Sequence, residues 1–187
     1  MIHSVRFVSV LDTNVIFPLE LRDILFWFAH DGLYTPKWSK HIFDEWEDVM
    51  RRKKVSESEI LKRTGWANLA FPDAKVTGYE PFISHLELPD SKDCHVLAAA
   101  IKSNANLIVT NNLKDFPQEY LTTYGLEAKQ PDDFLTDLID LNPQLAIHSF
   151  RKLVLNRRSP EMDEFAVLEA LRRNGLKETA GYLHSLL

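Results

Sequence analysis

The sequence predicts an α/β fold in which helices cover a parallel sheet in three α/β/α layers, followed by a helical appendage. Two short segments, residues 5–11 (VRFVSVL) and 107–110 (LIVT), are apolar and rich in β-branched residues, as in strands buried on both faces. Segments with helical spacing alternate with strand signals, and this rhythm favours parallel strands joined by right-handed crossovers. We therefore predict an α/β domain over residues 1–142 and a helical extension over residues 143–187.

The first strand ends at Asp12, Thr13 and Asn14, residue types that favour turns and helix caps. Ser56 and Glu59 form a capping-box pattern, which predicts that a helix starts there. Elsewhere in this half of the chain, apolar spacing and β-branched runs define the elements. They are, in order, a helix at 19–30, a short strand at 34–36, helices at 40–50 and 56–70, and a short strand at 74–77 within the loop 71–87.

The second half continues the alternation of helix and strand. Asp90 and Ser91 follow Pro89 and predict the start of a helix that ends at Asn104, because Asp and Ser are common N-caps. The strand at 107–110 comes next. The remaining elements are a polar turn at 111–115, a weak strand at 126–129, a helix at 132–141, and two or three short helices in the extension, broken near residues 158–160 and 174–175.

Composition excludes several classes of protein. Of the 187 residues, 45% are hydrophobic and 26% are charged, which excludes a wholly disordered chain. The formal net charge of −5 excludes a strongly cationic nucleic-acid coat, but not a nucleic-acid enzyme, because local fields matter more than the sum.

The single cysteine, Cys94, excludes a disulfide framework and a thiolate zinc site, and it fits a reducing compartment. No apolar run reaches the roughly 20 residues that span a bilayer. Residues 1–12 lack the pattern of a signal peptide. We therefore expect a cytoplasmic protein that does not enter a membrane.

Two acidic residues follow the ends of the two clearest strands. Asp12 comes directly after the first strand, and Asp115 lies shortly after the strand at 107–110. Because the carboxyl ends of parallel strands meet at one edge of a sheet, we expect both side chains at the same rim. Glu45 lies between the apolar Phe43 and Trp46 on a predicted helix, and Asp93 shares a helix face with Val96 and Leu97, so both are expected at positions that face that rim.

Each acid also has a structural interpretation. Asp12, Asp90 and Asp93 would be helix caps or first-turn acids, Glu45 a solvated helix acid, and Asp115 a turn residue. A cluster would behave differently, because neighbouring carboxylates raise one another's pKa unless a cation neutralises them. Oxygen ligands without His or Cys suit Mg²⁺ or Mn²⁺, and such an ion activates water for attack on a phosphodiester.

Four segments resemble, in order, the successive motifs of the PIN-domain family, and within it a VapC-type toxin. They are LDTNVIF, HIFDEWEDVM, LPDSKDCHVLAAAI and LIVTNNLKDFP, and the resemblance covers roughly residues 5–135. It implies a parallel sheet flanked by helices and RNA hydrolysis with Mg²⁺ or Mn²⁺. The extension from Pro143 is a departure from the pattern, since minimal toxins of this family lack it.

The resemblance also implies roles for individual residues. The four metal-binding, catalytic acids are Asp12, Glu45, Asp93 and Asp115. Polar residues in supporting positions are Asn14, Asp90, Thr110 and Asn112. The implied partners are an RNA substrate, with transfer RNA as a candidate, a cognate antitoxin protein, and a second copy of the chain in a homodimer.

A basic run follows Glu45 on the same predicted helix. Arg51, Arg52, Lys53 and Lys54 either bind RNA phosphates or form a solvated helix face. His41 lies one turn from Glu45, which admits a transition-metal site, with a surface histidine as the alternative.

Two other function classes remain open. A phosphatase-like hydrolase would use Asp12 as a covalent nucleophile, but the general base expected two residues later falls at Asn14, which cannot serve. The second class is a PIN-like binding module that acts through a protein partner without appreciable catalysis. Metal-dependent RNA cleavage by the purified protein separates this module from the enzyme.

Overall fold

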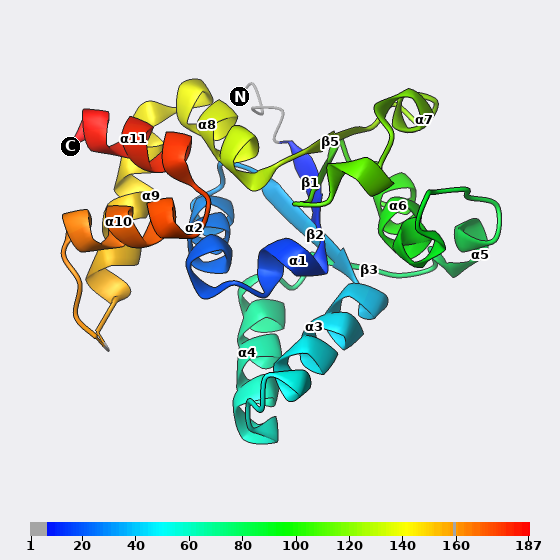
Figure 1. Cartoon of the computed structure of the whole chain (residues 1–187), viewed down its shortest axis with the longest axis horizontal. Helices are drawn as coiled ribbons and strands as arrows, with labels where there is room; N and C mark the ends of the chain where they lie inside the picture. Colours follow the sequence, from blue (N-terminus) through cyan, green and yellow to red (C-terminus); the bar gives the residue numbers. More distant parts are fainter. Residues whose placement is uncertain (1–6, 159) are drawn as a thin grey trace.

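The computed structural model describes residues 7–158 and 160–187, and it contains one parallel five-stranded sheet (Figure 1). The strand order is β3-β2-β1-β4-β5, and all four neighbouring pairs are parallel. The carboxyl ends of all strands therefore share one edge. The strands are β1 (Val8–Leu11), β2 (Thr35–Ser39), β3 (Lys75–Val76), β4 (Leu107–Val109) and β5 (Glu127–Lys129).

Helices flank this sheet, with α2 and α8 on one side and α6 on the other, and further helices follow at the C-terminus (Figure 1). The predicted α/β/α fold class is confirmed. The helices of residues 13–122 are α1 (Thr13–Ile16), α2 (Leu19–His30), α3 (Lys40–Arg52), α4 (Glu57–Ala70), α5 (Glu80–Ile83), α6 (Cys94–Lys102) and α7 (Gln118–Thr122), with 3₁₀ turns η1 (Ser91–Asp93) and η2 (Leu113–Asp115). Those of residues 131–186 are α8 (Pro131–Leu141), α9 (Pro143–Asn156), α10 (Glu164–Arg173) and α11 (Lys177–Leu186).

The two central strands bring distant parts of the chain together at the carboxyl edge. Leu11 of β1 and Val109 of β4 are fully buried register partners. The pairing continues one residue further, where the amide of Asp12 donates to the carbonyl of Val109 at 3.1 Å. Asp12 and Thr110 therefore leave the sheet side by side.

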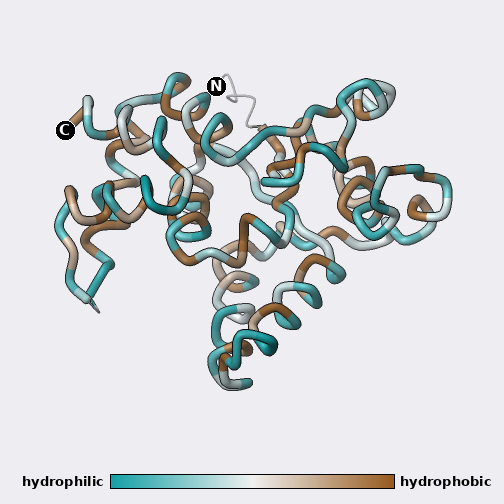
Figure 2. Tube along the Cα trace, viewed as in Figure 1, coloured by the Kyte–Doolittle hydropathy of each residue, from teal (hydrophilic) through white to brown (hydrophobic). Residues whose placement is uncertain are grey.

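Several predicted elements are confirmed by local chemistry. The Ser56 hydroxyl accepts a hydrogen bond from the Glu59 amide, as the capping-box pattern requires at the start of α4. Hydrophobic and hydrophilic residues alternate along α3 in Figure 2, as expected for a helix with one buried face. The helix at 19–30 matches α2 in both bounds.

Other elements differ from the prediction. The first strand begins at Val8, and residues 5 and 6 of the predicted strand lie outside the described part of the chain. The second strand runs over Thr35–Ser39 rather than 34–36. Two short helices, α5 and α7, occupy segments expected to be irregular, because helices of four and five residues are too short to show an amphipathic period.

The C-terminal helices pack against the α/β body rather than apart from it. Asp31, at the end of α2, accepts hydrogen bonds from Ser149 and Lys152 of α9, each at 2.7 Å. Asp132 of α8 accepts from the backbone amide and the hydroxyl of Thr179 in α11. The predicted boundary between residues 142 and 143 falls between two helices that pack together, and the division into two domains stays a prediction.

None of the helices in residues 7–158 and 160–187 is both long and apolar enough to cross a membrane. The expected cytoplasmic location stays a prediction.

Candidate functional site

Asp12 lies at the end of β1 with only 5% of its surface exposed. It occupies the N-cap position of α1, but within the described chain its side chain makes no capping hydrogen bond. Its Oδ2 instead accepts a hydrogen bond from the Thr110 hydroxyl at 2.7 Å and another from the side-chain Nδ2 of Asn14 at 2.5 Å. Burial raises the pKa of Asp12, and the hydrogen bond from Thr110 offsets only part of that rise. Asp12 therefore stands at the cap position, while its carboxylate is bonded to Thr110 and Asn14.

A polar network supports Asp12 from the end of β4. The Thr110 hydroxyl accepts from the Asn14 side chain and from the Asn112 amide, both at 3.0 Å. The carbonyl oxygen of the Asn14 side chain in turn accepts from the Asn111 amide at 2.9 Å. These bonds tie the first turn of α1 to the segment after β4, so the orientation of the Asp12 carboxylate is set by both central strands.

Asp93 lies where η1 passes into α6 and is half-buried. The pKa of its carboxyl is raised to about 6, first by burial and then by the negative charges of Asp12, Asp90 and Asp115. Asp90 also caps η1, because its side chain accepts from the Lys92 amide at 3.0 Å. The charges of three acids from separate segments thus meet at Asp93.

Glu45 of α3 is held from two sides. Its Oε2 accepts from the Thr13 hydroxyl at 2.7 Å, and its Oε1 lies 3.0 Å from Nε2 of His95. Burial would raise the pKa of Glu45, but the hydrogen bonds from His95 and Thr13 outweigh it, and the pKa is lowered. Its charge contributes to the raised pKa of Asp12. Glu45 therefore has hydrogen-bond partners on two other helices, although 44% of its side chain is exposed.

Asp115 lies in η2 and accepts a hydrogen bond from the Asn112 side chain. Its charge reaches Asp93, whose pKa it raises. It does not line the cavity that contains the other three acids, so it stands at the margin of the cluster.

A cavity of about 460 Å³ brings the predicted residues together at the carboxyl edge of the sheet. Carboxylates from the end of β1, from α3 and from the start of α6 open into it, beside the exposed Arg52. The lining residues are Asp12, Thr13, Asn14, Phe17, Glu45, Asp48, Val49, Arg52 and Asp93.

The donor set of this cavity fits a hard divalent cation. Carboxylate and amide oxygens are the ligands that Mg²⁺ and Mn²⁺ prefer. The pKa of Asp93 is raised mainly by burial, and the negative charges of Asp12, Asp90 and Asp115 raise it further. Within residues 7–158 and 160–187, no three His, Cys, Asp or Glu side chains are already arranged to hold a metal ion.

The members of the basic run have different surroundings. Arg51 is bound by Glu47, Asp48 and Glu57 at 2.9–3.1 Å. Arg52 instead lines the acidic cavity. Lys53 and Lys54 are exposed where α3 ends. Arg52 is therefore the member of the run best placed to meet a ligand of the cavity.

His41 and His95 are next to each other, although they are 54 positions apart in the sequence. Nδ1 of His41 lies 2.7 Å from the Tyr79 hydroxyl, and the two imidazole rings are 5.3 Å apart. The described residues contain no arrangement of His and Glu that would hold a transition metal, so that interpretation of His41 and Glu45 is not supported. His95 was not among the predicted site residues. In the sequence, it is indicated only as a polar residue inside an otherwise apolar helix segment.

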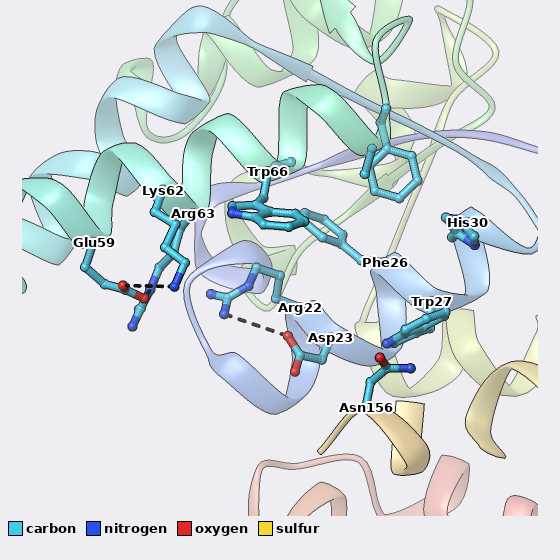
Figure 3. A pocket seen from close by; sticks show the side chains of 13 residues that line it. Arg22, Asp23, Phe26, Trp27, His30, Glu59, Lys62, Arg63, Trp66 and Asn156 are labelled. Carbon is cyan, nitrogen blue, oxygen red and sulfur yellow. Dashed lines mark hydrogen bonds and ion pairs between the residues drawn. The ribbon is translucent and has the colours of Figure 1, made fainter. Parts of the chain in front are cut away.

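A second, larger cavity of about 720 Å³ lies between α2 and α4 (Figure 3). Phe26 and Trp27 line it from α2, and Trp66 lines it from α4 with 64% of its surface exposed. Lys62 and Arg63 lie at its rim, and the end of α9 contributes Asn156.

Comparisons with known proteins agree with this geometry. A sequence model of the PIN domain matches residues 8–114, more than half of the chain, and a model of the VapC50 C-terminal domain matches residues 131–185. A protein of Mycobacterium tuberculosis (strain ATCC 25618 / H37Rv), named "Putative ribonuclease VapC50", is 34% identical over 123 residues, which cover 59% of this chain and 72% of that protein. No solved structure matches the chain at a comparable level.

Proposed function

We propose, from the premise that the chain belongs to the PIN-domain family and carries a VapC50-type C-terminal domain, that it is a metal-dependent endoribonuclease, the toxin of a type II toxin–antitoxin pair. The observation that carries the proposal is the cavity at the carboxyl edge of the sheet, which Asp12, Glu45 and Asp93 line together. The raised pKa of Asp93 agrees with it: burial is the largest cause, and the charges of Asp12, Asp90 and Asp115 add to it. Neighbouring carboxylates repel one another, and a bound cation relieves that repulsion.

Asp12, Glu45, Asp93 and Asp115 would hold Mg²⁺ or Mn²⁺, as one or two ions. When bound, the ion supplies an activated water and stabilises the leaving oxygen of the phosphodiester. Thr110 and Asn14 fix the orientation of the Asp12 carboxylate. Arg52, on the wall of the same cavity, would bind a phosphate of the RNA.

The test is a digest of total RNA by the purified full chain, with Mg²⁺ and with EDTA, followed by mapping of the cut sites. The wild-type protein should cut at discrete positions only with the metal, and D93N should not cut. Cleavage that persists in EDTA or in D93N would contradict the proposal. A protein that binds an RNA or a protein partner without cutting would instead be the binding module. The mapped sites would also show whether transfer RNA is the substrate.

An antitoxin is the partner expected of such a toxin, and the cavity between α2 and α4 suits an amphipathic segment of it (Figure 3). Trp27 and the exposed Trp66 offer apolar surface, whereas Lys62 and Arg63 at the rim already pair with Glu59, so the apolar contact carries the proposal. Replacing Trp66 by Ala should weaken antitoxin binding and leave RNA cleavage by the free toxin unchanged, because Trp66 does not line the acidic cavity. The homodimer remains a prediction.

A further inference from the structure

His95 is a buried polar residue in the apolar helix α6. It is 8% exposed, and the residues that follow it, Val96 and Leu97, are fully buried. Placing an imidazole in such surroundings costs free energy unless its nitrogens find partners. Nε2 has one, because it lies 3.0 Å from Oε1 of Glu45.

The second ring nitrogen of His95, Nδ1, differs from Nε2 in its surroundings. Nδ1 is buried and has no hydrogen-bond partner in the described part of the chain. The Glu45 carboxylate is the acceptor in this pair, so Nε2 carries the hydrogen and Nδ1 is left with an unused lone pair. An apolar side chain would fill the same space without that penalty. The contact that distinguishes histidine from such a residue is therefore the bond to Glu45.

Glu45 differs from its neighbours on α3 in its partners. Glu47 and Asp48, on the same helix, bind Arg51. Glu45 instead accepts a hydrogen bond from Thr13 of α1 and lies 3.0 Å from Nε2 of His95 in α6. Its side chain lines the same cavity as Asp12 and Asp93, so these two contacts hold the carboxylate beside the acidic cluster.

We propose that His95 is a positioning residue: its Nε2–H holds the Glu45 carboxylate in the cavity, and through Glu45 it sets the affinity of the acidic cluster for the divalent ion. The proposal rests on the metal site of the proposed function. His41, fixed by its hydrogen bond to Tyr79, packs beside the His95 ring and limits its rotation.

The test measures Mn²⁺ affinity of the purified full chain without RNA, by electron paramagnetic resonance or calorimetry. In H95Q, the amide nitrogen can take the place of Nε2, whereas H95F fills the ring volume without a donor. Loss of a residue that orients a metal ligand typically costs 10–100-fold in affinity. We expect H95F to lose affinity by about that factor and H95Q to stay close to wild type.

The E45A background separates positioning from packing. If His95 acts through Glu45, then H95F should weaken Mn²⁺ binding no further once Glu45 is gone. An equal loss in both backgrounds would overturn the proposal, and so would an H95F affinity equal to wild type or an H95Q affinity as low as that of H95F. Thermal unfolding checks that each variant folds, and H95N, whose amide is too short to reach Glu45, replaces H95F if that variant does not.

The same titration distinguishes this inference from the proposed function. If the wild type binds Mn²⁺, D93N does not, and His95 has no effect, only the positioning role of His95 fails. If the wild type itself does not bind Mn²⁺, both the metal site and the inference fail.

Discussion

The Thr110 hydroxyl donates a hydrogen bond of 2.7 Å to Oδ2 of Asp12, across the carboxyl ends of the two central strands. The two residues are 98 positions apart in the sequence, and the parallel pairing of β1 with β4 brings them together. The bond stabilises the ionised form of a carboxyl whose pKa burial raises. The ionisation of Asp12 therefore depends on a residue at the end of the neighbouring strand.

Replacing Thr110 by Val should make RNA cleavage more sensitive to acid. The change removes a donor to a charged group, which is worth about 1.5–3 kcal/mol, and the pKa of Asp12 should rise further. The acid limb of the rate profile should then move to higher pH. The measurement is the cleavage rate between pH 5 and pH 9 for both proteins. A limb that stays in place would show that Asp12 ionises independently of Thr110.

Metal-free stability should fall as the pH rises through the titration range of Asp93. The folded-state pKa of about 6 lies above the ordinary value of 3.8 for an aspartate. The stabilisation from the protonated form is therefore complete below the ordinary value and is lost as the pH rises through the folded-state pKa. Because the side chain is half exposed, solvent screening reduces the effect to about 1 kcal/mol. Urea unfolding at pH 4.5 and pH 7 measures it.

Between pH 4.5 and pH 7, the metal-free unfolding free energy of D93N should fall less than that of the wild type. At pH 7 without metal, D93N should be at least as stable as the wild type. Added Mg²⁺ should raise the stability of wild type at pH 7 but not that of D93N. A metal-free D93N that is clearly less stable would identify Asp93 as a structural helix residue.

Arg52 and Arg51 form a matched pair for testing RNA contact. Arg52 lines the acidic cavity, whereas Arg51 is bound by three acids. In a D93N background, which prevents cutting, R52A should weaken RNA binding and reduce the salt slope by about one phosphate contact. R51A should change both much less. Fluorescence anisotropy over a range of KCl concentrations tests this, and equal effects of the two changes would contradict it.

Asp31 should anchor the C-terminal helices to α2. Its side chain is 6% exposed, and although burial raises its pKa, the hydrogen bonds from Lys152 and Ser149 outweigh burial and lower it. D31N should therefore lose about 1–3 kcal/mol of unfolding free energy at pH 7. In the wild type, the stabilisation from ionised Asp31 is complete above the ordinary pKa of an aspartate. It is lost as the pH falls through the lowered pKa of Asp31 in the folded state. Urea unfolding measures it, and D73N, a change at an exposed loop position, is the control. A D31N loss no larger than that of D73N would contradict the anchor.

The sequence was sufficient for the features that depend on local pattern. The apolar runs predicted β1 and β4, helical spacing predicted α2 and α3, and the rule that parallel strands end at one edge predicted that the residues following β1 and β4 share a rim. Each of these depends on neighbouring residues or on a rule that holds for the whole fold class.

The contacts between side chains on separate helices were not predictable in this way. Glu45 and His95 are 50 positions apart on α3 and α6, and no local pattern indicates that they pair. Two of the three acids that bind Arg51 are at helical spacing from it on α3, because Glu47 and Asp48 precede it by four and three residues. The third, Glu57, lies on α4, and its contact with Arg51 depends on the turn between α3 and α4.

The central claim is that carboxylates from separate segments share one divalent ion. The most direct measurement is anomalous diffraction from crystals of the full chain grown with MnCl₂. The account predicts a Mn²⁺ peak within ligating distance of the Asp12 and Asp93 carboxylates, and its loss in D93N. A Mn²⁺-soaked crystal with no peak in that cavity, or with peaks only elsewhere on the molecule, would contradict it.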